Sequence, residues 1–428
     1  MKMQMKVLLL FIGGGILRYL FSTSRIAKPF IERNEISTPL NAFKRVQEGI
    51  YLHKNGIDPY TGDIVHETPV VLLALGNIVT KAPELVPLLY IFLDLFTAFI
   101  LYNASKNYIR KKYLEQLEEE SKYAPDADEL KLHLQDEELI PFYVLLAYLF
   151  NPMSVLSCSA LTSAVFSNLL LALTLWCLNK HLFLPCLVLL SLETMRNLYP
   201  IVLLSPIIMV FANRSKYKAI GIVLLFGIFF FGVMLLNYSI MKSWNFLDGT
   251  LGFIFFYRDL QPNIGLFWYF FTEMFEHFRI MFLITFQMNA TVLYLIPLTM
   301  KMRKEPFLLA TILIALISIF RSYPCLGDVG LYLALLPLWR TCWKFMAHKF
   351  LVFCMVLVTL SLLPALWYLW IHAGSANANF YFGVTLALSS GQIFLITDLL
   401  FAYVKRQFCL YNGQDVYIDG VEANIKLE

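Results

Sequence analysis

Long apolar runs, separated by short polar segments, occupy most of this 428-residue chain. A run of about 18 or more apolar residues with few charges predicts a helix that crosses a membrane. The pattern predicts twelve helices, with loose boundaries where a run is shorter than the roughly 20 residues of a straight span. They lie at about 7–22, 84–104, 139–157, 160–178, 182–195, 198–212, 219–241, 279–300, 306–320, 326–343, 350–371 and 379–404.

The composition indicates the same class of protein. Hydrophobic residues make up 59% of the sequence and charged residues only 15%, and no water-soluble core could bury so much apolar surface. Seven cysteines occur without a CxxC pair, which is typical of small buried hydrophobes. No set of His, Cys, Asp and Glu has the spacing of metal ligands. We therefore expect an all-α polytopic membrane protein that forms one multispanning domain over 1–428, with no cofactor and no metal.

Basic residues gather beside alternate ends of the predicted helices, and such clusters are expected to face the cytosol. Examples are "SKNYIRKKY", "NRSKYK", "MKMRKE" and the "KR" at 405–406. The loop 105–138 and the tail 405–428 are then cytosolic, and both termini lie on that side. The segments 23–83 and 242–278 become lumenal loops. We expect the first apolar run to be a signal anchor rather than a cleaved leader.

The stretch "NIGLFWYFFTEMFEHF", residues 263–278, combines many aromatic residues with two carboxylates and a histidine. On a helical wheel its apolar side chains fill one arc, while Tyr269, Glu273, Glu276 and His277 lie on the other. Such a helix is expected to lie in the plane of a membrane interface, before a spanning helix that begins at about 279. Its polar face either contacts a ligand or is simply solvated, with Glu273 and His277 supporting each other at i and i+4.

A second polar segment on the lumenal side is "WYLWIHAGSANANFYF", residues 367–382. Aromatic residues on both sides of its turn are typical of belts at a membrane interface. Ser375 fits an ordinary turn, but Asn377 and Asn379 offer amide donors and acceptors at headgroup depth, next to His372. This turn is the segment that residue chemistry favours most as a binding site.

Charged residues within the apolar runs form a third group. A charge at the bilayer centre costs roughly 2.5–3.5 kcal/mol on insertion scales, so these residues should face the bundle interior or partner subunits. Glu193 and Arg196, at i and i+3, are expected to neutralise each other. The other residues of the group are Asp94, Arg321, Asp328 and Asp398.

Several of these segments carry a family resemblance. The first lumenal loop contains "TPLNAFKRVQEG" and "DPYTGDIVHETP", together with the apolar piece "VVLLALGNIV", which is too short to span and is expected to be re-entrant or interfacial. With "LQPNIGLFWYFFTEMFEHF", "SYPCLGDVGLYLALLPLW" and "LWYLWIHAGSANANFYF", the chain closely resembles the PIG-U family of membrane subunits of the GPI transamidase. The resemblance runs nearly end to end. The architecture of that family is similar to the GT-C glycosyltransferases, which matches twelve helices with a long first lumenal loop.

The resemblance implies a subunit of a multi-subunit complex in the endoplasmic reticulum membrane. There a caspase-like protease subunit cleaves a C-terminal signal from a precursor protein and joins the new carboxyl to the ethanolamine amine of a GPI lipid. This chain is expected to be non-catalytic and to bind or present the GPI lipid beside the protease and further membrane subunits, with no role for nucleic acid. The expected lipid-binding residues are Asn377, Asn379, His372, Ser375, Asn263, Glu276 and His277.

Two other functions stay open. An active GT-C mannosyltransferase, dependent on dolichol-phosphate-mannose, is similar in "DPYTGDIVHETP" and in the pair Asn151-Pro152. Such enzymes usually carry an acidic D-x-D motif in the first lumenal loop, where a carboxylate acts as a base or binds a metal. Here the corresponding place is "ERNEIS", which offers only Glu32 or Glu35 as a base. The third function is a pure assembly scaffold that contacts no lipid.

Overall fold

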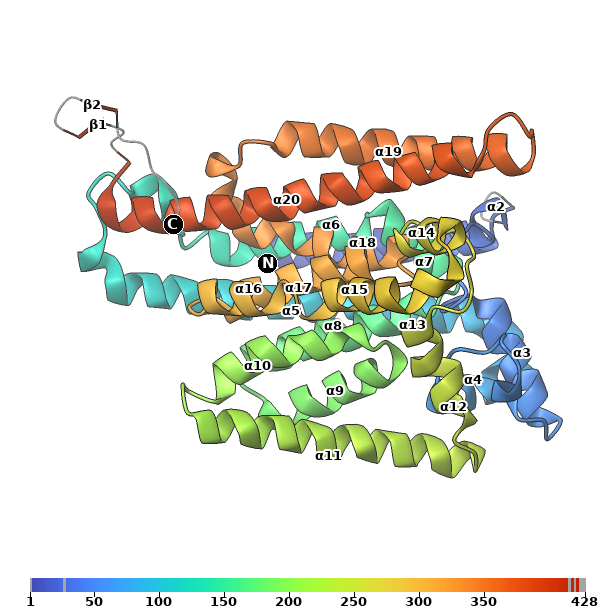
Figure 1. Ribbon diagram of the computed structural model, residues 1–428. Helices are drawn as coiled ribbons and strands as arrows, with labels where there is room; N and C mark the ends of the chain where they lie inside the picture. The colour runs from blue at the N-terminus through green and yellow to red at the C-terminus, as the bar shows by residue number, and fades with distance from the viewer. Residues whose placement is uncertain (1, 26–27, 415–416, 419–420, 423–428) are drawn as a thin grey trace.

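In the computed structural model the chain is a bundle of helices that run roughly side by side (Figure 1). The structure describes residues 2–25, 28–414, 417–418 and 421–422. The α-helices are α1 (Lys2–Thr23), α2 (Lys28–Ile31), α3 (Phe43–Lys54), α4 (Pro69–Lys81), α5 (Val86–Glu119), α6 (Asp136–Leu149), α7 (Pro152–Ser159), α8 (Ala164–Asn179), α9 (Phe183–Arg196), α10 (Leu204–Phe211), α11 (Lys216–Met241), α12 (Asn245–Leu247), α13 (Phe253–Phe256), α14 (Phe267–Glu273), α15 (Arg279–Thr291), α16 (Leu295–Lys301), α17 (Pro306–Phe320), α18 (Leu326–Leu335), α19 (Lys349–Ile371) and α20 (Ala378–Asn412).

Short elements connect these helices. A minimal antiparallel pair of strands, β1 (Tyr417–Ile418) and β2 (Val421–Glu422), follows α20. The single-turn and irregular helices are η1 (Pro59–Thr61), η2 (Pro83–Leu85), η3 (Glu120–Lys122), η4 (Asp128–Leu130), η5 (Tyr199–Leu203), η6 (Asp248–Gly252), η7 (Glu276–Phe278) and η8 (Leu336–Phe345).

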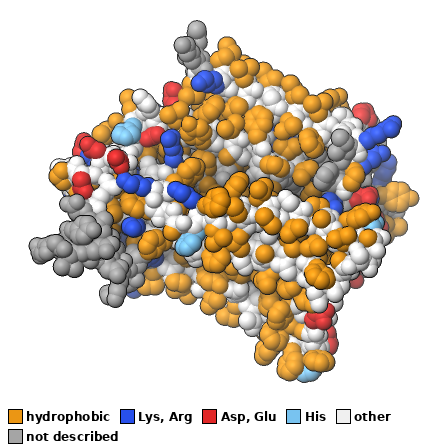
Figure 2. Space-filling view, turned by 90° about the horizontal axis from the view of Figure 1, so that it is seen from above, with side chains coloured by type: hydrophobic (Ala, Val, Ile, Leu, Met, Phe, Trp, Pro, Cys, Tyr) orange, Lys and Arg blue, Asp and Glu red, His pale blue; other side chains and the backbone are white. Residues whose placement is uncertain are grey.

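The predicted helical class is confirmed, since each of the twelve predicted segments is helical for most of its length. Six helices of the described chain are long and apolar enough to cross a membrane, and a seventh span results if the bent pair α6 and α7 is counted as one. The remaining apolar helices are shorter, so a total of twelve spans stays a prediction. Figure 2 shows a broad hydrophobic surface whose charged side chains gather toward the two ends of the bundle, as expected for helices surrounded by lipid.

The bend between α6 and α7 measures 47° and follows from the sequence Asn151-Pro152. The Asn151 side-chain oxygen accepts a hydrogen bond of 3.0 Å from the backbone N–H of Met153, and Pro152 occupies the first turn of α7. Asparagine before proline is a strong helix start, because the amide caps a free N–H and proline has none to leave unpaired. This pair therefore restarts the helix in a new direction.

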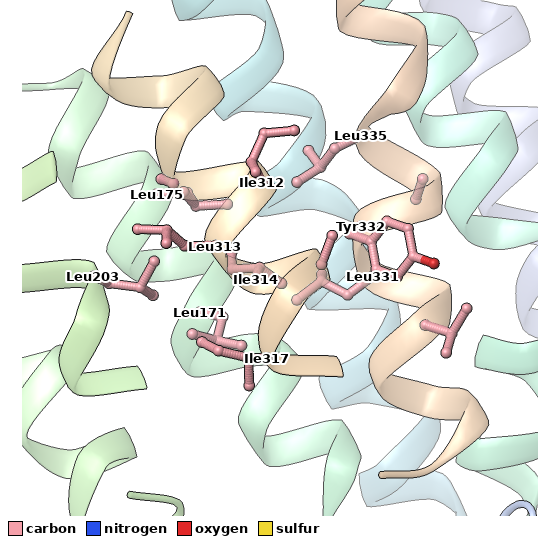
Figure 3. Packing of buried hydrophobic residues seen from close by; sticks show 14 of the residues in the cluster. Leu171, Leu175, Leu203, Ile312, Leu313, Ile314, Ile317, Leu331, Tyr332 and Leu335 are labelled. Carbon is pink, nitrogen blue, oxygen red and sulfur yellow. The ribbon is translucent and has the colours of Figure 1, made fainter. Parts of the chain in front are cut away.

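Helix α17 forms the centre of the core. Of its 15 residues, 13 are buried, because α8, η5, α10, α15 and α18 pack around it. Figure 3 shows Ile312, Leu313, Ile314 and Ile317 between leucines of its neighbours. A helix that is apolar on all sides is stable only when it is enclosed in this way.

The predicted inward orientation of the intramembrane charges is confirmed: Asp94, Glu193, Arg196, Arg321, Asp328 and Asp398 are all buried. Asp94 pairs with Arg18 of α1 and accepts a hydrogen bond of 2.7 Å from the hydroxyl of Tyr148. Asp398 accepts hydrogen bonds of 3.0 and 2.9 Å from the backbone N–H groups of Ala347 and His348, at the start of α19. Each of these carboxylates thus has a partner that offsets its removal from water.

The prediction of one amphipathic helix over 263–278 is wrong in its extent. Helix α14 ends at Glu273, and the backbone of Met274 and Phe275 is extended, with ψ of 154° and 138°. A single helical wheel does not apply beyond such a break, and the Phe275 side chain, assigned to the apolar arc, is 73% exposed. Within α14, Phe267, Trp268 and Phe271 of the apolar arc are buried, whereas Phe270 is 40% exposed, and the interfacial placement of the helix stays a prediction.

The segments predicted to be lumenal gather at one end of the bundle. Helices α3, α4, α12 and α14 and the turn after α19 lie at the right of Figure 1, whereas η3, η4 and the C-terminal end of α20 lie at the left. We name these two ends the lumenal end and the cytosolic end after the sequence prediction, and the orientation itself stays a prediction. The loop 105–138 begins as a continuation of α5, which extends to Glu119.

Candidate functional site at the lumenal end

The motif "DPYTGDIVHETP" folds into the base of the lumenal end. The Asp58 carboxylate accepts a hydrogen bond of 3.0 Å from the backbone N–H of Tyr60 and so starts η1. The Tyr60 hydroxyl donates to the backbone carbonyl of Glu67. Tyr60, His66 and Glu67 are all buried. Local capping therefore turns the loop inward and carries His66 and Glu67 into the bundle.

Glu67 meets Arg196, the last residue of α9, in a two-pronged ion pair. The Nε and Nη2 groups of Arg196 each donate to one Glu67 carboxylate oxygen, both at 2.9 Å. Arg196 also donates to Glu193 at 3.2 Å, as the i, i+3 spacing predicted, and to the Ser167 hydroxyl at 3.1 Å. Breaking a buried pair of this kind leaves an uncompensated charge, so the lumenal loop is held firmly on α9.

A second ion pair lies across a small cavity from the first. Arg321 and Asp328 approach to 2.7 Å, and the side chain of Asn197, with its amide turned so that the oxygen faces Arg321, accepts from both guanidinium Nη groups at 3.3 Å. The cavity between the pairs has a volume of about 20 Å³ and is lined by residues of both. That is room for about one water molecule, so this cluster is a closed polar core of the fold rather than a binding cleft.

His66 contacts three side chains or backbone groups at the lumenal end, on Arg45, Gly249 and Phe253. Its Nε2 lies 3.0 Å from Nη1 of Arg45, which also pairs with Asp259 at 2.9 Å. Since the guanidinium can only donate, Nε2 accepts, and Nδ1 carries the proton that it donates to the Gly249 carbonyl at 2.8 Å. The ring stacks on Phe253. Burial, with a smaller contribution from Arg45, lowers the pKa of His66 to about 4, and the imidazole is neutral at pH 7.

Aromatic side chains join α14 to the α19–α20 hairpin. The indole of Trp268 stacks near Trp370 at 6.1 Å between ring centroids, and Tyr381 lies 5.3 Å from Trp367. The two predicted belts thus meet in one cluster whose members reach across three helices. Such clusters are typical of the headgroup level of a membrane.

Asn377 is the N-cap of α20. Its side-chain oxygen accepts hydrogen bonds from the backbone N–H groups of Asn379 at 3.1 Å and Phe380 at 3.4 Å. This contact explains the residue structurally, because asparagine is among the best N-caps. The residue is nevertheless exposed, and its amide NH₂ donates no hydrogen bond to the described residues, which leaves two donors available.

The other residues of the turn are also exposed. Asn379 accepts a hydrogen bond from the hydroxyl of Tyr269 on α14. Ser375 and His372 lie at the tip of the hairpin, where the His372 ring is 5.5 Å from that of Tyr368. The structure therefore brings Asn377, Asn379, Ser375 and His372 together on one exposed turn.

The remaining candidates are placed apart from this turn. Asn263 is fully buried, and its side-chain oxygen accepts a hydrogen bond of 2.8 Å from the backbone N–H of Gly265. It therefore closes a turn and is not accessible to a lipid in this structure. Glu276 and His277 are exposed beside the break after α14. Glu276 lies 4.0 Å from Arg279, which is a weak contact.

Sequence reasoning missed the Glu67–Arg196 pair and the contact between Tyr269 and Asn379. The first joins residues 129 apart and the second residues 110 apart. Only the presence of "HET" inside a recognisable motif pointed to Glu67, and Tyr269 was assigned to the polar arc without a partner. Long-range pairings of this kind have no periodic signature.

Long apolar helices, buried ion pairs and a polar end together define a polytopic membrane protein. A family model described as "GPI transamidase subunit PIG-U" matches residues 12–388. The chain is 37% identical to "GPI-anchor transamidase component PIGU" of Homo sapiens, with 99% of each protein covered. It is 28% identical to "GPI transamidase component GAB1" of Saccharomyces cerevisiae, with 87% of this chain and 88% of that protein covered. The chain belongs to the PIG-U family and is a component of the GPI transamidase.

Proposed function

We propose that this chain binds the GPI lipid at the turn between α19 and α20 and presents it for attachment to the C-terminus of precursor proteins. It acts as a non-catalytic subunit in the endoplasmic reticulum membrane, with both termini cytosolic, beside the protease subunit and further membrane subunits. In this proposal the bundle has twelve spans and a GT-C-like arrangement. The observation that carries the proposal is the exposed pair Asn377 and Asn379 at the tip of an aromatic-lined hairpin.

The chemistry of the turn suits the headgroup of this lipid. Carboxamides both donate and accept, so they can pair with phosphate oxygens and sugar hydroxyls. A neutral amide also suits a zwitterionic phosphoethanolamine, because a fixed negative charge would repel its phosphate and a fixed positive charge would repel its ammonium group.

Apolar side chains lie directly beside these amides. Tyr368, Ile371 and Phe380 are 59%, 48% and 60% exposed at the lumenal ends of α19 and α20. Acyl chains could pack against this surface while the glycan stays at the turn, because lipid-facing helices offer the same apolar environment as the bilayer. The surface thus combines polar groups for a glycan headgroup with an apolar face for acyl chains.

The carboxylates required by the mannosyltransferase alternative are engaged elsewhere. Glu35 is buried and pairs with Arg33 at 2.8 Å, and Glu32 pairs with Lys44. Hydrogen bonding to Lys44 lowers the pKa of Glu32, and a weaker base accepts a proton less readily. These contacts support the non-catalytic role.

The test is Asn379→Ala in cells that lack the endogenous chain, with surface display of a GPI-anchored reporter measured by flow cytometry. The matched control is Asn412→Ala, an exposed asparagine at the opposite end of the same helix. We expect display to fall several-fold for Asn379→Ala and to stay normal for Asn412→Ala, while both variants co-purify with the other subunits. Normal display for both would favour a scaffold that contacts no lipid.

The orientation has its own test. Asp63 is 84% exposed at the lumenal end and Asp128 is 79% exposed at the cytosolic end. Asp63→Cys should react with an impermeant thiol reagent only after microsomes are opened, and Asp128→Cys before. Reaction of both cysteines from the same side would contradict the proposed orientation.

A further inference from the structure

The cytosolic end contains a cavity of about 730 Å³. It lies between the extension of α5, the connection from α16 to α17, η8 and the last turns of α20, and we call it the cytosolic cavity. Its volume is within the usual range for small-molecule sites, roughly 300–1,000 Å³. We propose that the cytosolic cavity binds the headgroup of an anionic phospholipid from the cytosolic leaflet.

A buried donor in the cavity wall lacks a partner. Trp339 lines the cavity and is only 3% exposed, yet its indole N–H has no hydrogen-bond partner within the part of the chain that the structure describes. An indole nitrogen can only donate, and leaving a buried donor without a partner is unfavourable. A phosphate or carboxylate oxygen of a ligand would satisfy this group.

Three of the four carboxylates in the cavity wall form ion pairs, two of them with the same lysine. Lys112 pairs with Glu305 at 2.6 Å and with Glu115 at 2.7 Å. Glu119 pairs with Lys122 at 3.3 Å and accepts a hydrogen bond of 2.6 Å from the Tyr411 hydroxyl. The negative charge of these three groups therefore does not repel an incoming anion at full strength.

The cations of the cavity are less completely matched. Arg303 and Lys304 are exposed and form no ion pair with any described residue. Arg406 is buried, and within the described residues its guanidinium donates to the backbone carbonyl of Leu130, at 3.2 and 2.6 Å, a contact that does not neutralise its charge. Glu118 is the one lining carboxylate without an ion pair among the described residues. Over the whole lining, five cations (Lys112, Lys301, Arg303, Lys304 and Arg406) face four carboxylates (Glu115, Glu118, Glu119 and Glu305), and this excess of positive charge favours an anionic ligand.

The position of the cavity favours a lipid over a free anion. Met300 of α16 lines the cavity and is 59% exposed, and Ile296, one turn earlier, is 60% exposed. This apolar strip leads from the outer surface of the bundle to the cavity rim beside Arg303 and Lys304. An acyl chain could lie along it while the phosphate reaches the basic rim. Basic sites between helices on the cytosolic side are suited to anionic headgroups.

The experiment is native mass spectrometry of the full chain in detergent, titrated with dioctanoyl phosphatidic acid. Dioctanoyl phosphatidylcholine and inorganic phosphate form the comparison arms. The double variant Arg303→Gln with Lys304→Gln removes the exposed cations, and Lys216→Gln with Lys218→Gln removes two exposed lysines from another basic cluster at the same end. Trp339→Phe removes the indole donor while keeping an aromatic ring.

We expect phosphatidic acid to bind more tightly than phosphatidylcholine and inorganic phosphate. The Arg303 and Lys304 variant should weaken its binding about tenfold or more, Trp339→Phe about three- to tenfold, and the control by less than twofold. Equal binding of phosphatidylcholine, equally tight binding of inorganic phosphate, or unchanged binding by the Arg303 and Lys304 variant would overturn the proposal. If Trp339→Phe reduces the folded yield, the Arg303→Gln with Lys304→Gln variant alone tests the proposal. None of these outcomes depends on the lumenal turn.

Discussion

The hydroxyl of Tyr269 on α14 donates a hydrogen bond to the side-chain oxygen of Asn379 on α20, across 110 residues of sequence. The Tyr269 ring also stacks on Phe382, with 4.3 Å between the ring centroids. The first contact fixes the Asn379 oxygen and leaves its NH₂ group directed elsewhere. Helix α14 thus orients an amide of the turn between α19 and α20.

Tyr269→Phe should separate positioning from direct contact. The substitution keeps the ring that stacks on Phe382 but removes the hydrogen bond, worth about 0.5–1.5 kcal/mol. We expect reporter display to fall less than for Asn379→Ala, since the amide is still present. A defect as large as that of Asn379→Ala would show that the hydrogen bond itself, not lipid contact, accounts for the role of Asn379.

The two roles of Asn377 can be separated in the same way. Asn377→Asp keeps a capping oxygen and adds a negative charge that is favourable at the N-terminus of α20. It removes the free NH₂ group and would repel a lipid phosphate. We expect unchanged or slightly higher thermal stability in detergent, with reporter display reduced several-fold.

Two controls accompany that variant. Asn377→Ser keeps a capping oxygen without the charge, and Asn377→Ala should lower helix stability by about 1 kcal/mol. Full reporter display by Asn377→Asp would exclude a phosphate contact at this position.

Glu67→Ala tests the buried ion pair with Arg196. Because the change leaves Arg196 with Glu193 as its one charged partner among the described residues, we expect the free energy of unfolding to fall by roughly 3–5 kcal/mol. The measurement is folded yield and thermal midpoint after detergent extraction. Glu32→Ala is the matched control, since its pair with Lys44 is exposed and should contribute little. Equal effects of the two substitutions would show that burial of the Glu67–Arg196 pair does not increase its contribution to stability.

The lowered pKa of His66 predicts that the protein loses stability in acid. Its pKa is about 4 in the folded protein and about 6.5 when exposed. The unfolded chain therefore binds more protons between these values, so the contribution of neutral His66 is complete above pH 6.5 and is lost as the pH falls toward 4. The loss amounts to about 3 kcal/mol.

The pH dependence is measured as the thermal midpoint at pH 7 and pH 4.5, for the natural chain and for His66→Gln. Glutamine does not titrate, so the variant should be less stable at pH 7 but should lose less on acidification. A variant with the same pH dependence as the natural chain would assign the effect to other groups.

Periodicity and charge spacing predicted much of the helical arrangement. The apolar runs located the helices, and the cost of charge in lipid correctly predicted that Asp94, Arg321 and Asp398 point inward. The i, i+3 pairing of Glu193 with Arg196 was also predictable, because both residues lie on one helix.

The candidate site was less predictable. The stretch 263–278 carries an amphipathic pattern, but no local signal marked the extended backbone at Met274 and Phe275. Asn263 was chosen for its side-chain chemistry, whereas its burial depends on distant elements. The capping role of Asn377 could have been anticipated, since asparagine directly before a long helix is a common start signal.

Photo-crosslinking from the turn between α19 and α20 measures directly whether the GPI lipid contacts it. A photoreactive amino acid replaces Ser375, which is exposed at the tip, or Tyr217, which is 89% exposed at the cytosolic end of α11. Microsomes containing the assembled complex and radiolabelled GPI lipid are irradiated, and lipid attached to the chain is counted. Lipid binding at the turn predicts labelled lipid on the Ser375 variant and none above background on the Tyr217 variant. Absence of lipid at Ser375 in an assembled complex, or equal capture at both positions, would contradict it.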